Sequence, residues 1–220
     1  MEPSVQLRKA GRPVGADVAI ATRKKILDAA TLCFAELGYA AASNREIARR
    51  AGVTSGSLYH YFDSKAALYR AALQDANQRL ISAYHHVVEE HPGARSVDQL
   101  CLGLSRAFEL ARERPGMMNF ASASALEIQR NKDLDWLARE DAEAFPVFFR
   151  TLLKQAKSRG ELGAGVNIDA AMNVILISFA SLAFLQGKLV DETSFDESLK
   201  AFQQLLRGEM FLRQAAPCDV

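Results

Sequence analysis

The chain has 220 residues, of which 49% are apolar, and its formal net charge at pH 7 is +1. This length and apolar content allow one large or two small domains with packed cores, without disulfides or structural metals. The three cysteines, Cys33, Cys101 and Cys218, lack metal-ligand spacing, and their odd number argues against a closed disulfide framework. The first twenty residues lack the apolar stretch of a secretory signal, so we expect a cytoplasmic protein without cofactors.

Charge is distributed unevenly along the chain. Residues 1–65 hold ten Lys or Arg against six Asp or Glu, whereas residues 66–220 hold seventeen against twenty. A basic N-terminal part predicts a module that faces a polyanion, and an acidic remainder predicts a module with another task. A solvated basic face without a partner is the alternative interpretation.

Apolar residues recur at helical spacing and period-two alternation is absent, so the fold class is predicted to be all-α. A first helix is expected from Thr22, which can cap it, to Gly38. Ser43 to Glu46 form a capping-box pattern that opens a second helix, and Gly52 closes it. A third short helix follows and ends near Phe62. Two short helices joined by a tight turn that contains glycine predict a helix-turn-helix.

Ser64 can cap a long helix from Lys65 towards Glu90. Further helices are expected over Ser96–Arg114, Gly116–Gln129, Leu134–Arg159, Asp169–Leu189 and Asp196–Leu212. We therefore predict a flexible basic arm at 1–21, a helix-turn-helix domain at 22–66 and a larger helical domain at 67–220.

The third helix has two different faces. Leu58 and Phe62 lie on one side, which predicts packing against the first two helices, while Gly56 and His60 fall on the opposite side. A helix start with a glycine and short hydroxyl residues can approach a phosphate backbone closely, as a recognition helix in the major groove must. Arg45, at the start of the second helix, is the candidate for a bidentate guanine contact.

Residues 22–68 resemble the DNA-binding domain of the tetracycline-repressor (TetR) family. The resemblance lies in GY after the first helix, the IA-x-x-AGV turn, G-x-LYHYF and the final SK, in this order. It implies an N-terminal three-helix helix-turn-helix domain joined to a larger helical domain that binds a ligand and dimerises. Ala42 departs from the pattern, because the family often has a hydroxyl residue there.

The resemblance also implies which residues meet double-stranded DNA. The predicted contact residues are Ser43, Asn44, Arg45, Thr54, Ser55, Gly56, Ser57, Tyr59, His60 and Tyr61, with Lys65 on a phosphate. Other roles remain open for some of them: Arg45 can pair with a neighbouring carboxylate, Tyr61 can lie at the edge of the core, and Lys65 can be a solvated charge. The basic residues Arg8, Lys9 and Arg12 form an arm that can lie in a narrow minor groove or have no role.

Beyond residue 68 the resemblance is one of architecture only. Met and Phe residues suggest an adaptable apolar pocket for a small-molecule effector, although a plain hydrophobic core explains them too. The candidates are Met117, Met118, Phe120, Phe145, Phe148, Phe149, Met172 and Phe179. Residues 170–190 are nearly long enough to span a membrane, but polar residues leave an uninterrupted apolar core that is too short. We expect a second copy of the chain to cover part of this helix. The predicted homodimer interface includes Phe184, Phe202, Leu205 and Leu206.

We therefore predict a dimeric transcriptional regulator, a repressor released from a pseudo-palindromic operator by its ligand. In the mechanism that the family implies, the ligand favours a dimer whose recognition helices are wrongly spaced for DNA. Two alternatives remain. His85 and His86 form i, i+4 pairs with Glu89 and Glu90 that suit a metal-dependent enzyme or metal sensor, and an architectural DNA binder would have no effector.

Overall fold

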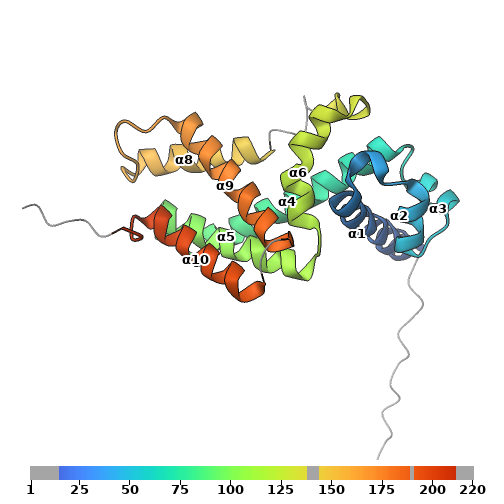
Figure 1. Ribbon diagram of the computed structural model, residues 1–220, viewed down its shortest axis with the longest axis horizontal. Helices are drawn as coiled ribbons and strands as arrows, with labels where there is room; N and C mark the ends of the chain where they lie inside the picture. The colour runs from blue at the N-terminus through green and yellow to red at the C-terminus, as the bar shows by residue number, and fades with distance from the viewer. Residues whose placement is uncertain (1–14, 138–143, 189–190, 212–220) are drawn as a thin grey trace, which may run out of the picture.

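The structure, a computed structural model, describes residues 15–137, 144–188 and 191–211. Every regular element in these ranges is a helix, which confirms the predicted fold class. The elements are α1 (Gly15–Ala41), α2 (Asn44–Ala51), α3 (Ser55–Tyr61), α4 (Lys65–Glu90), α5 (Ser96–Glu113), α6 (Met117–Arg130), η1 (Lys132–Leu134), α8 (Ala144–Ser158), α9 (Ile168–Lys188) and α10 (Glu192–Arg207). Figure 1 shows α1, α2 and α3 at one end of an elongated molecule, with α8, α9 and α10 towards the other.

The three N-terminal helices form the helix-turn-helix domain, and their boundaries follow from side-chain caps. The hydroxyl of Ser43 accepts a hydrogen bond from the Glu46 backbone N–H at 3.2 Å, and that of Thr54 accepts from Ser57 at 3.1 Å. Such caps satisfy N–H groups that have no partner within the helix. The cap predicted for α4 is also present, since Ser64 accepts from the Ala67 N–H at 3.0 Å.

The first helix begins earlier than its cap residue predicted. α1 starts at Gly15, and the Thr22 hydroxyl donates to the Val18 carbonyl at 2.8 Å instead of capping the helix. Alanines before Thr22 and an acidic residue in the first turn, Asp17, favour this longer helix. The predicted limit of the arm at residue 21 therefore falls inside α1. The predicted arm contacts Arg8, Lys9 and Arg12 lie outside the described residues.

Helix α4 joins the two parts of the molecule, because it packs against α1 on one side and α5 on the other. Where α1, α4 and α6 meet, four aromatic rings form a cluster: Phe34, Tyr39, Tyr69 and Phe120. An ion pair between Arg114 and Asp28, at 2.7 Å, also links α5 to α1. The N-terminal domain thus shares one continuous core with the helices that follow.

Within the C-terminal domain, α4 and α5 approach so closely that only glycine fits at Gly103. A Cβ added there would lie 2.3 Å from Cδ2 of Tyr84 on α4. The Tyr84 ring also packs edge-on against Phe148 of α8, with 4.6 Å between centroids. The helix predicted over Leu134–Arg159 is described as η1 and α8, with residues 138–143 between them outside the described ranges.

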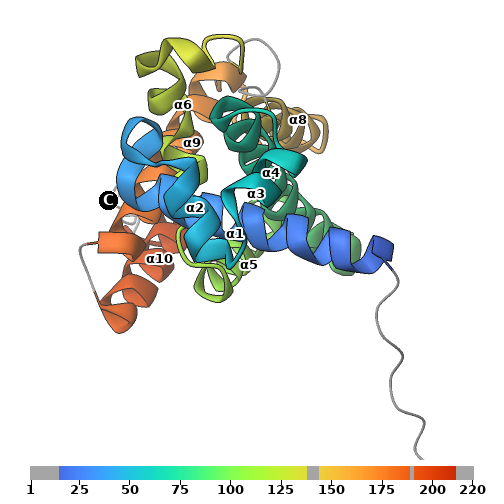
Figure 2. The same cartoon turned by 90° about the vertical axis from the view of Figure 1, so that its right-hand side faces the viewer.

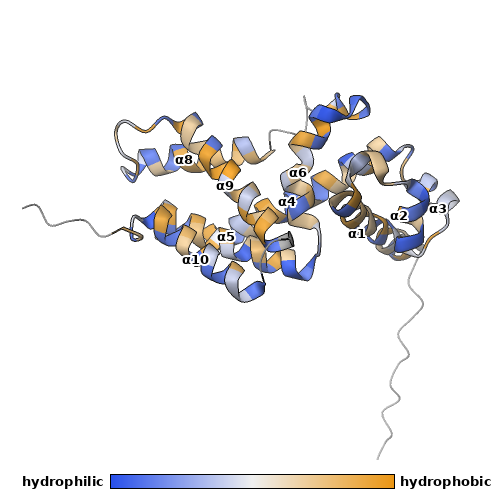
Figure 3. Cartoon of the chain, viewed as in Figure 1, coloured by the Kyte–Doolittle hydropathy of each residue, from blue (hydrophilic) through white to orange (hydrophobic). Residues whose placement is uncertain are grey.

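Helix α9 is the most apolar of the described helices by sequence, and much of it faces outwards. Ile168–Gln186 is long and apolar enough to cross a membrane by length and composition, but only 22% of its most apolar window is buried. Figure 3 shows apolar residues along α9. Its exposed side carries Val174, Ile177 and Phe184 at helical spacing.

Candidate nucleic-acid interface

Helix α3 presents the two faces that its sequence predicts. Leu58 and Phe62 are buried against α1 and α2, whereas Gly56, Tyr59 and His60 are exposed. A Cβ built on Gly56 would meet only the Thr54 hydroxyl, at 3.9 Å. The first turn of α3 is therefore open to close approach by another molecule. Figure 2 looks onto this end of the protein, with α2 and α3 in front.

The start of α2 lies beside this face and leaves Arg45 uncommitted. Glu46 instead accepts hydrogen bonds from Arg49 at 2.8 and 2.7 Å and from Arg50 at 2.8 Å. These two guanidinium groups lower the pKa of Glu46 to about 2. Within the described ranges the exposed side chain of Arg45 makes no hydrogen bond or ion pair, so its pairing with a neighbouring carboxylate is not observed. The Oδ1 atom of Asn44 is buried without a partner in the same part of the chain.

Lys65 is placed differently from the other predicted contacts. Its Nζ donates to the backbone carbonyls of Tyr39 at 2.8 Å, Ala40 at 3.3 Å and Ala42 at 3.1 Å. The ammonium also lies 4.3 Å from the centroid of the Tyr39 ring. Its three donors are thus engaged at the end of α1. Lys65 is therefore not the solvated charge considered from sequence. A phosphate contact by Lys65 stays a prediction, and it requires the ammonium to share its donors between the phosphate and these carbonyls.

The remaining predicted contacts lie on the same end of the molecule. Ser43, Thr54 and Ser55 are exposed, Ser57 and Tyr61 are partly buried, and the rings of His60 and Tyr61 stand edge to face 5.5 Å apart. Tyr61 packs at the edge of the core, as its alternative interpretation required. Sequence reasoning missed Arg23, whose guanidinium lies 5.4 Å from the centroid of the Phe62 ring at the base of α3. The basic run Arg23-Lys24-Lys25 was the available signal.

The predicted effector residues fall into two packed groups. Met117, Met118 and Phe120 are buried where α6 meets α1. Phe145, Phe148, Phe149 and Phe179 form an aromatic cluster across α8 and α9, which Phe108 and Phe195 extend, and Met172 is buried on α9. The positions suit a domain core as much as a pocket wall.

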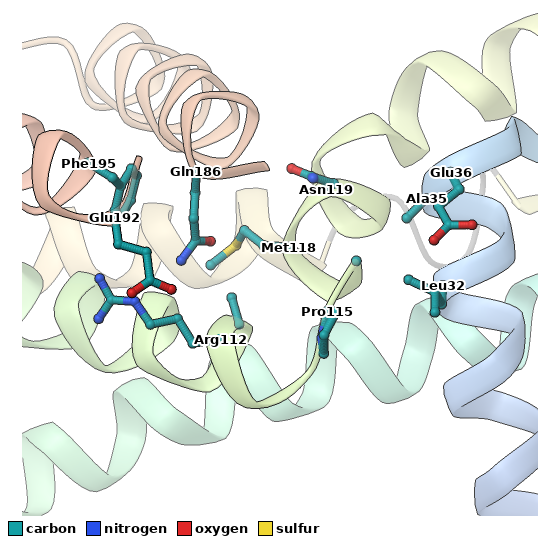
Figure 4. A pocket seen from close by; sticks show the side chains of 12 residues that line it. Leu32, Ala35, Glu36, Arg112, Pro115, Met118, Asn119, Gln186, Glu192 and Phe195 are labelled. Carbon is teal, nitrogen blue, oxygen red and sulfur yellow. The ribbon is translucent and has the colours of Figure 1, made fainter. Parts of the chain in front are cut away.

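Cavities occur beside these groups. One of about 710 Å³ lies among α5, α8, α9 and α10, and its wall includes Leu100, Leu152, Leu153, Ile175 and Leu206. Of these, only Leu206 was among the predicted site residues, and it was assigned to the dimer interface. A second cavity, of about 460 Å³, lies between α1 and parts of α5, α6, α9 and α10 (Figure 4). Figure 4 shows Met118, Asn119 and Gln186 on one side of it and Leu32 with Glu36 on the other.

Two polar features of the C-terminal domain bear on the predicted effector and on the alternative metal site. Four buried side-chain atoms on α4 and α6 lack a hydrogen-bond partner within the described ranges: Tyr69 Oη, Asn77 Oδ1, Tyr84 Oη and Ser122 Oγ. His85 and His86 are exposed near the C-terminal end of α4, where His86 lies 3.5 Å from Glu89. In the part of the chain that the structure describes, no three His, Cys, Asp or Glu side chains gather as a metal site would require.

The predicted dimer residues lie on two helices, Phe184 on α9 and Phe202, Leu205 and Leu206 on α10. Phe184 is 54% exposed and Leu205 47%, while Phe202 and Leu206 are partly buried. Val174 and Ile177 are more exposed still, at 63% and 66%, and sequence reasoning did not single them out. Their spacing of three and seven residues from each other and from Phe184 was the signal that could have found them.

Comparison with known proteins supports the resemblance of the N-terminal domain to the TetR family. Residues 26–72 match the family model described as bacterial regulatory proteins, tetR family. The transcriptional regulator UidR of Escherichia coli K12 is 26% identical over 182 residues, which cover 82% of this chain and 90% of UidR.

Solved structures show the same fold. The fatty acid degradation regulator FadR from Bacillus halodurans superposes with a TM-score of 0.68 at 22% identity, covering 86% of this chain and 99% of that one. FadR from Bacillus subtilis in complex with stearoyl-CoA gives 0.66 at 23% identity, over 86% and 99% of the two chains. With its helix-turn-helix, its exposed α3 face and the family match over residues 26–72, the N-terminal part of the chain is a DNA-binding domain of the TetR family.

Proposed function

We propose that the protein is a ligand-released repressor that binds a pseudo-palindromic DNA operator as a homodimer in the cytoplasm. The observation that carries this proposal is the exposed first turn of α3, where Gly56 and His60 face outwards while Leu58 anchors the helix. A recognition helix needs this combination, because its N-terminal residues must reach base edges without a collision between backbones. The residues proposed for this contact are those predicted from sequence at the starts of α2 and α3.

Arg45 is the proposed source of base selectivity. It is exposed beside α3 and makes no ion pair within the described residues, so its guanidinium is available for two parallel hydrogen bonds to guanine. Arg49 and Arg50 are held by Glu46 and are less suited to that task. The serine and threonine hydroxyls of α3 suit adaptable contacts to bases or phosphates.

The exposed apolar side of α9 supports a homodimer. Val174, Ile177 and Phe184 form an exposed stripe along this helix, and Leu205 on α10 is exposed as well. A contiguous apolar surface of this kind is a feature of protein interfaces. In a symmetric dimer each stripe covers the other, so the two recognition helices are held at one fixed separation.

The unpartnered polar atoms of α4 and α6 support a small-molecule effector in the C-terminal domain. A buried polar group without a hydrogen bond costs about 1–3 kcal/mol, which a ligand with matching donors would recover. Tyr84, whose hydroxyl oxygen is one of these atoms, packs its ring edge-on against Phe148. The Bacillus subtilis relative bound to stearoyl-CoA is consistent with an effector that has a large apolar part. We propose 22–66 as the DNA-binding domain and 67–220 as the domain that binds effector and partner.

Release follows from the way the domains are joined. Only Phe62, Asp63 and Ser64 separate α3 from α4, and α4 runs into the core of the C-terminal domain. A ligand that binds better when α4 is tilted shifts the population towards dimers with wrongly spaced recognition helices.

Selection from a random DNA pool tests the proposal. Duplexes retained by the purified protein are sequenced, and we expect a pseudo-palindrome with half-sites about one helical turn apart. Recovery of unenriched sequences would favour an architectural DNA binder. Stearoyl-CoA, with free CoA as control, is then added to the complex, and fluorescence anisotropy follows release of the selected duplex. An effector with a large apolar part predicts release by stearoyl-CoA alone.

A further inference from the structure

Charged side chains from two helices hold the last turn of α1, which follows the kink at Gly38 and precedes α2. Glu127, on α6 of the C-terminal domain, accepts a hydrogen bond from the Tyr39 backbone N–H at 2.9 Å. Lys65, at the start of α4, donates to the carbonyl of the same residue at 2.8 Å. Both backbone polar groups of Tyr39 are therefore bound by charged partners, and we call this arrangement the Tyr39 clamp.

Gly38 makes room for the clamp. It has φ 73° and ψ 170°, a conformation that turns the chain out of the helix and that residues with a side chain rarely adopt. A Cβ at this position would lie 3.3 Å from Oε1 of Glu127 and 3.6 Å from Oε2. The glycine therefore both turns the backbone and lets the carboxylate approach it.

Other groups fix the two charged side chains in place. The Asn131 amide donates to the Glu127 carboxylate at 3.3 Å while it caps the end of α6 through the Glu127 carbonyl at 2.7 Å. On the other side, the buried Tyr39 ring lies under the Lys65 ammonium and packs edge-on against Tyr69, 5.4 Å away. Neither charged group can move freely without breaking several of these contacts.

The clamp connects α6 to the DNA-binding end of the molecule. The turn that it holds leads directly into α2, whose first residues include the cap Ser43 and the exposed Arg45. Because Glu127 belongs to α6, a displacement of that helix moves the acceptor of the Tyr39 N–H. Hydrogen bonds to a charged group are about twice as strong as neutral ones, so the turn should follow the helix.

We propose that Glu127 is a positioning residue for DNA binding, which from α6 sets the orientation of the reading helices relative to the C-terminal domain. Its effect on DNA rests on the proposed function, whereas the clamp itself can be tested without DNA. The Glu127→Ala variant removes the acceptor, and Glu127→Gln keeps an amide oxygen in the same place. Glu109→Ala is the matched control, because Glu109 is an exposed glutamate on α5 that pairs only with Arg106 among the described residues.

Backbone amide hydrogen exchange, resolved by residue with NMR, measures the clamp. In Glu127→Ala we expect the Tyr39 amide to exchange roughly tenfold faster or more, with Glu127→Gln close to the unmodified protein and Glu109→Ala unchanged. An unchanged Tyr39 rate in Glu127→Ala would overturn the proposal. If that variant loses protection throughout α2 and α4, Asn131→Ala replaces it, since it keeps Glu127 and removes the amide that holds its carboxylate and caps the end of α6. A smaller increase in the same amide is then expected, and its absence overturns the proposal.

Affinity for the selected operator measures the consequence. We expect Glu127→Ala to bind roughly tenfold more weakly and to lose less affinity than the unmodified protein when one or two base pairs are inserted between half-sites. Fast exchange at Tyr39 together with unchanged affinity and spacing preference would refute the positioning role. If the unmodified protein selects no DNA, the proposed function fails and the DNA role of Glu127 with it, while the exchange rates still decide whether the clamp exists.

Discussion

Gly56 lies in the first turn of α3, where an added Cβ would meet only the Thr54 hydroxyl. The space in front of it is free in the isolated subunit, so a larger side chain there can be accommodated by the fold. In the proposed complex with DNA, the phosphate backbone or the base edges would occupy the same space. Folding and binding therefore place different demands on this residue, and substitution can separate them.

We predict that Gly56→Leu abolishes specific DNA binding, with a loss of roughly 100-fold or more, because the side chain keeps the helix start out of the groove. Fluorescence anisotropy with the selected operator measures the loss, and thermal unfolding shows that the fold is retained. Gly56→Ala is the control, and its unfolding temperature should stay the same or rise, since alanine favours a helix. Unchanged affinity in the leucine variant would show that another face of the domain meets DNA.

Arg45 permits a second residue-scale test. Arg45→Ala should cost about 1–3 kcal/mol at the half-site position that it reads and should equalise the four bases there. Binding of operators substituted one position at a time provides the measurement. Arg106→Ala removes an exposed arginine of α5 and should leave the profile unchanged. A uniform loss over all sequences would instead assign Arg45 to a phosphate.

At the scale of elements, the sequence predicted every helix of the N-terminal domain because its caps and turn glycines act locally. Ser43, Thr54 and Ser64 each bond an N–H three residues ahead, and such contacts are visible in a short window of sequence. The predicted start of α1 was wrong because the Thr22 hydroxyl can either cap a helix or donate to a carbonyl one turn earlier in a longer helix. It donates to the Val18 carbonyl. The role of Lys65 could not be predicted, since its carbonyl partners lie at and just after the end of α1, 23 to 26 residues earlier in the chain.

The contact between α4 and α5 gives a prediction for an element pair. Gly103→Ala places a methyl group 2.3 Å from the Tyr84 ring, closer than real contacts allow. Overpacking of this kind costs about 1–3 kcal/mol, whereas replacing glycine by alanine in a helix gains about 1 kcal/mol in helix propensity. We expect an overpacking cost in the upper part of its range and therefore a net loss of stability. Chemical denaturation should show a lower midpoint than for Gly56→Ala, the same exchange in an open site. Equal midpoints would mean that Tyr84 can move aside without loss.

For the whole molecule, fold class and the two-part organisation were predictable, while the cavities were not. Leu100, Leu152 and Leu206 line one cavity from three helices, and each has the helical spacing of an ordinary core residue. Only tertiary packing decides which such positions border empty space. The positions of Met117 and Phe120, next to α1, likewise depend on how α6 is placed against the N-terminal domain.

Subunit association gives the prediction at this scale. Ile177→Asp puts a charge in the middle of the exposed apolar side of α9, and burying it without a partner is costly. We expect a monomer by sedimentation velocity at a concentration where the unmodified protein is dimeric, with roughly 100-fold weaker operator binding because one half-site is lost. Val18→Asp, an equally polar change at an exposed valine of α1, should leave the sedimentation coefficient unchanged. A dimeric Ile177→Asp variant would place the interface elsewhere.

Pairing of two chains through the uncovered side of α9, as proposed, would also govern how the regulator responds to its own abundance. Below the concentration at which two chains pair, the number of competent pairs grows with the square of the number of chains made. Halving synthesis then removes about three quarters of the pairs by mass action. Control over the regulated genes would then fall more steeply than the protein level itself.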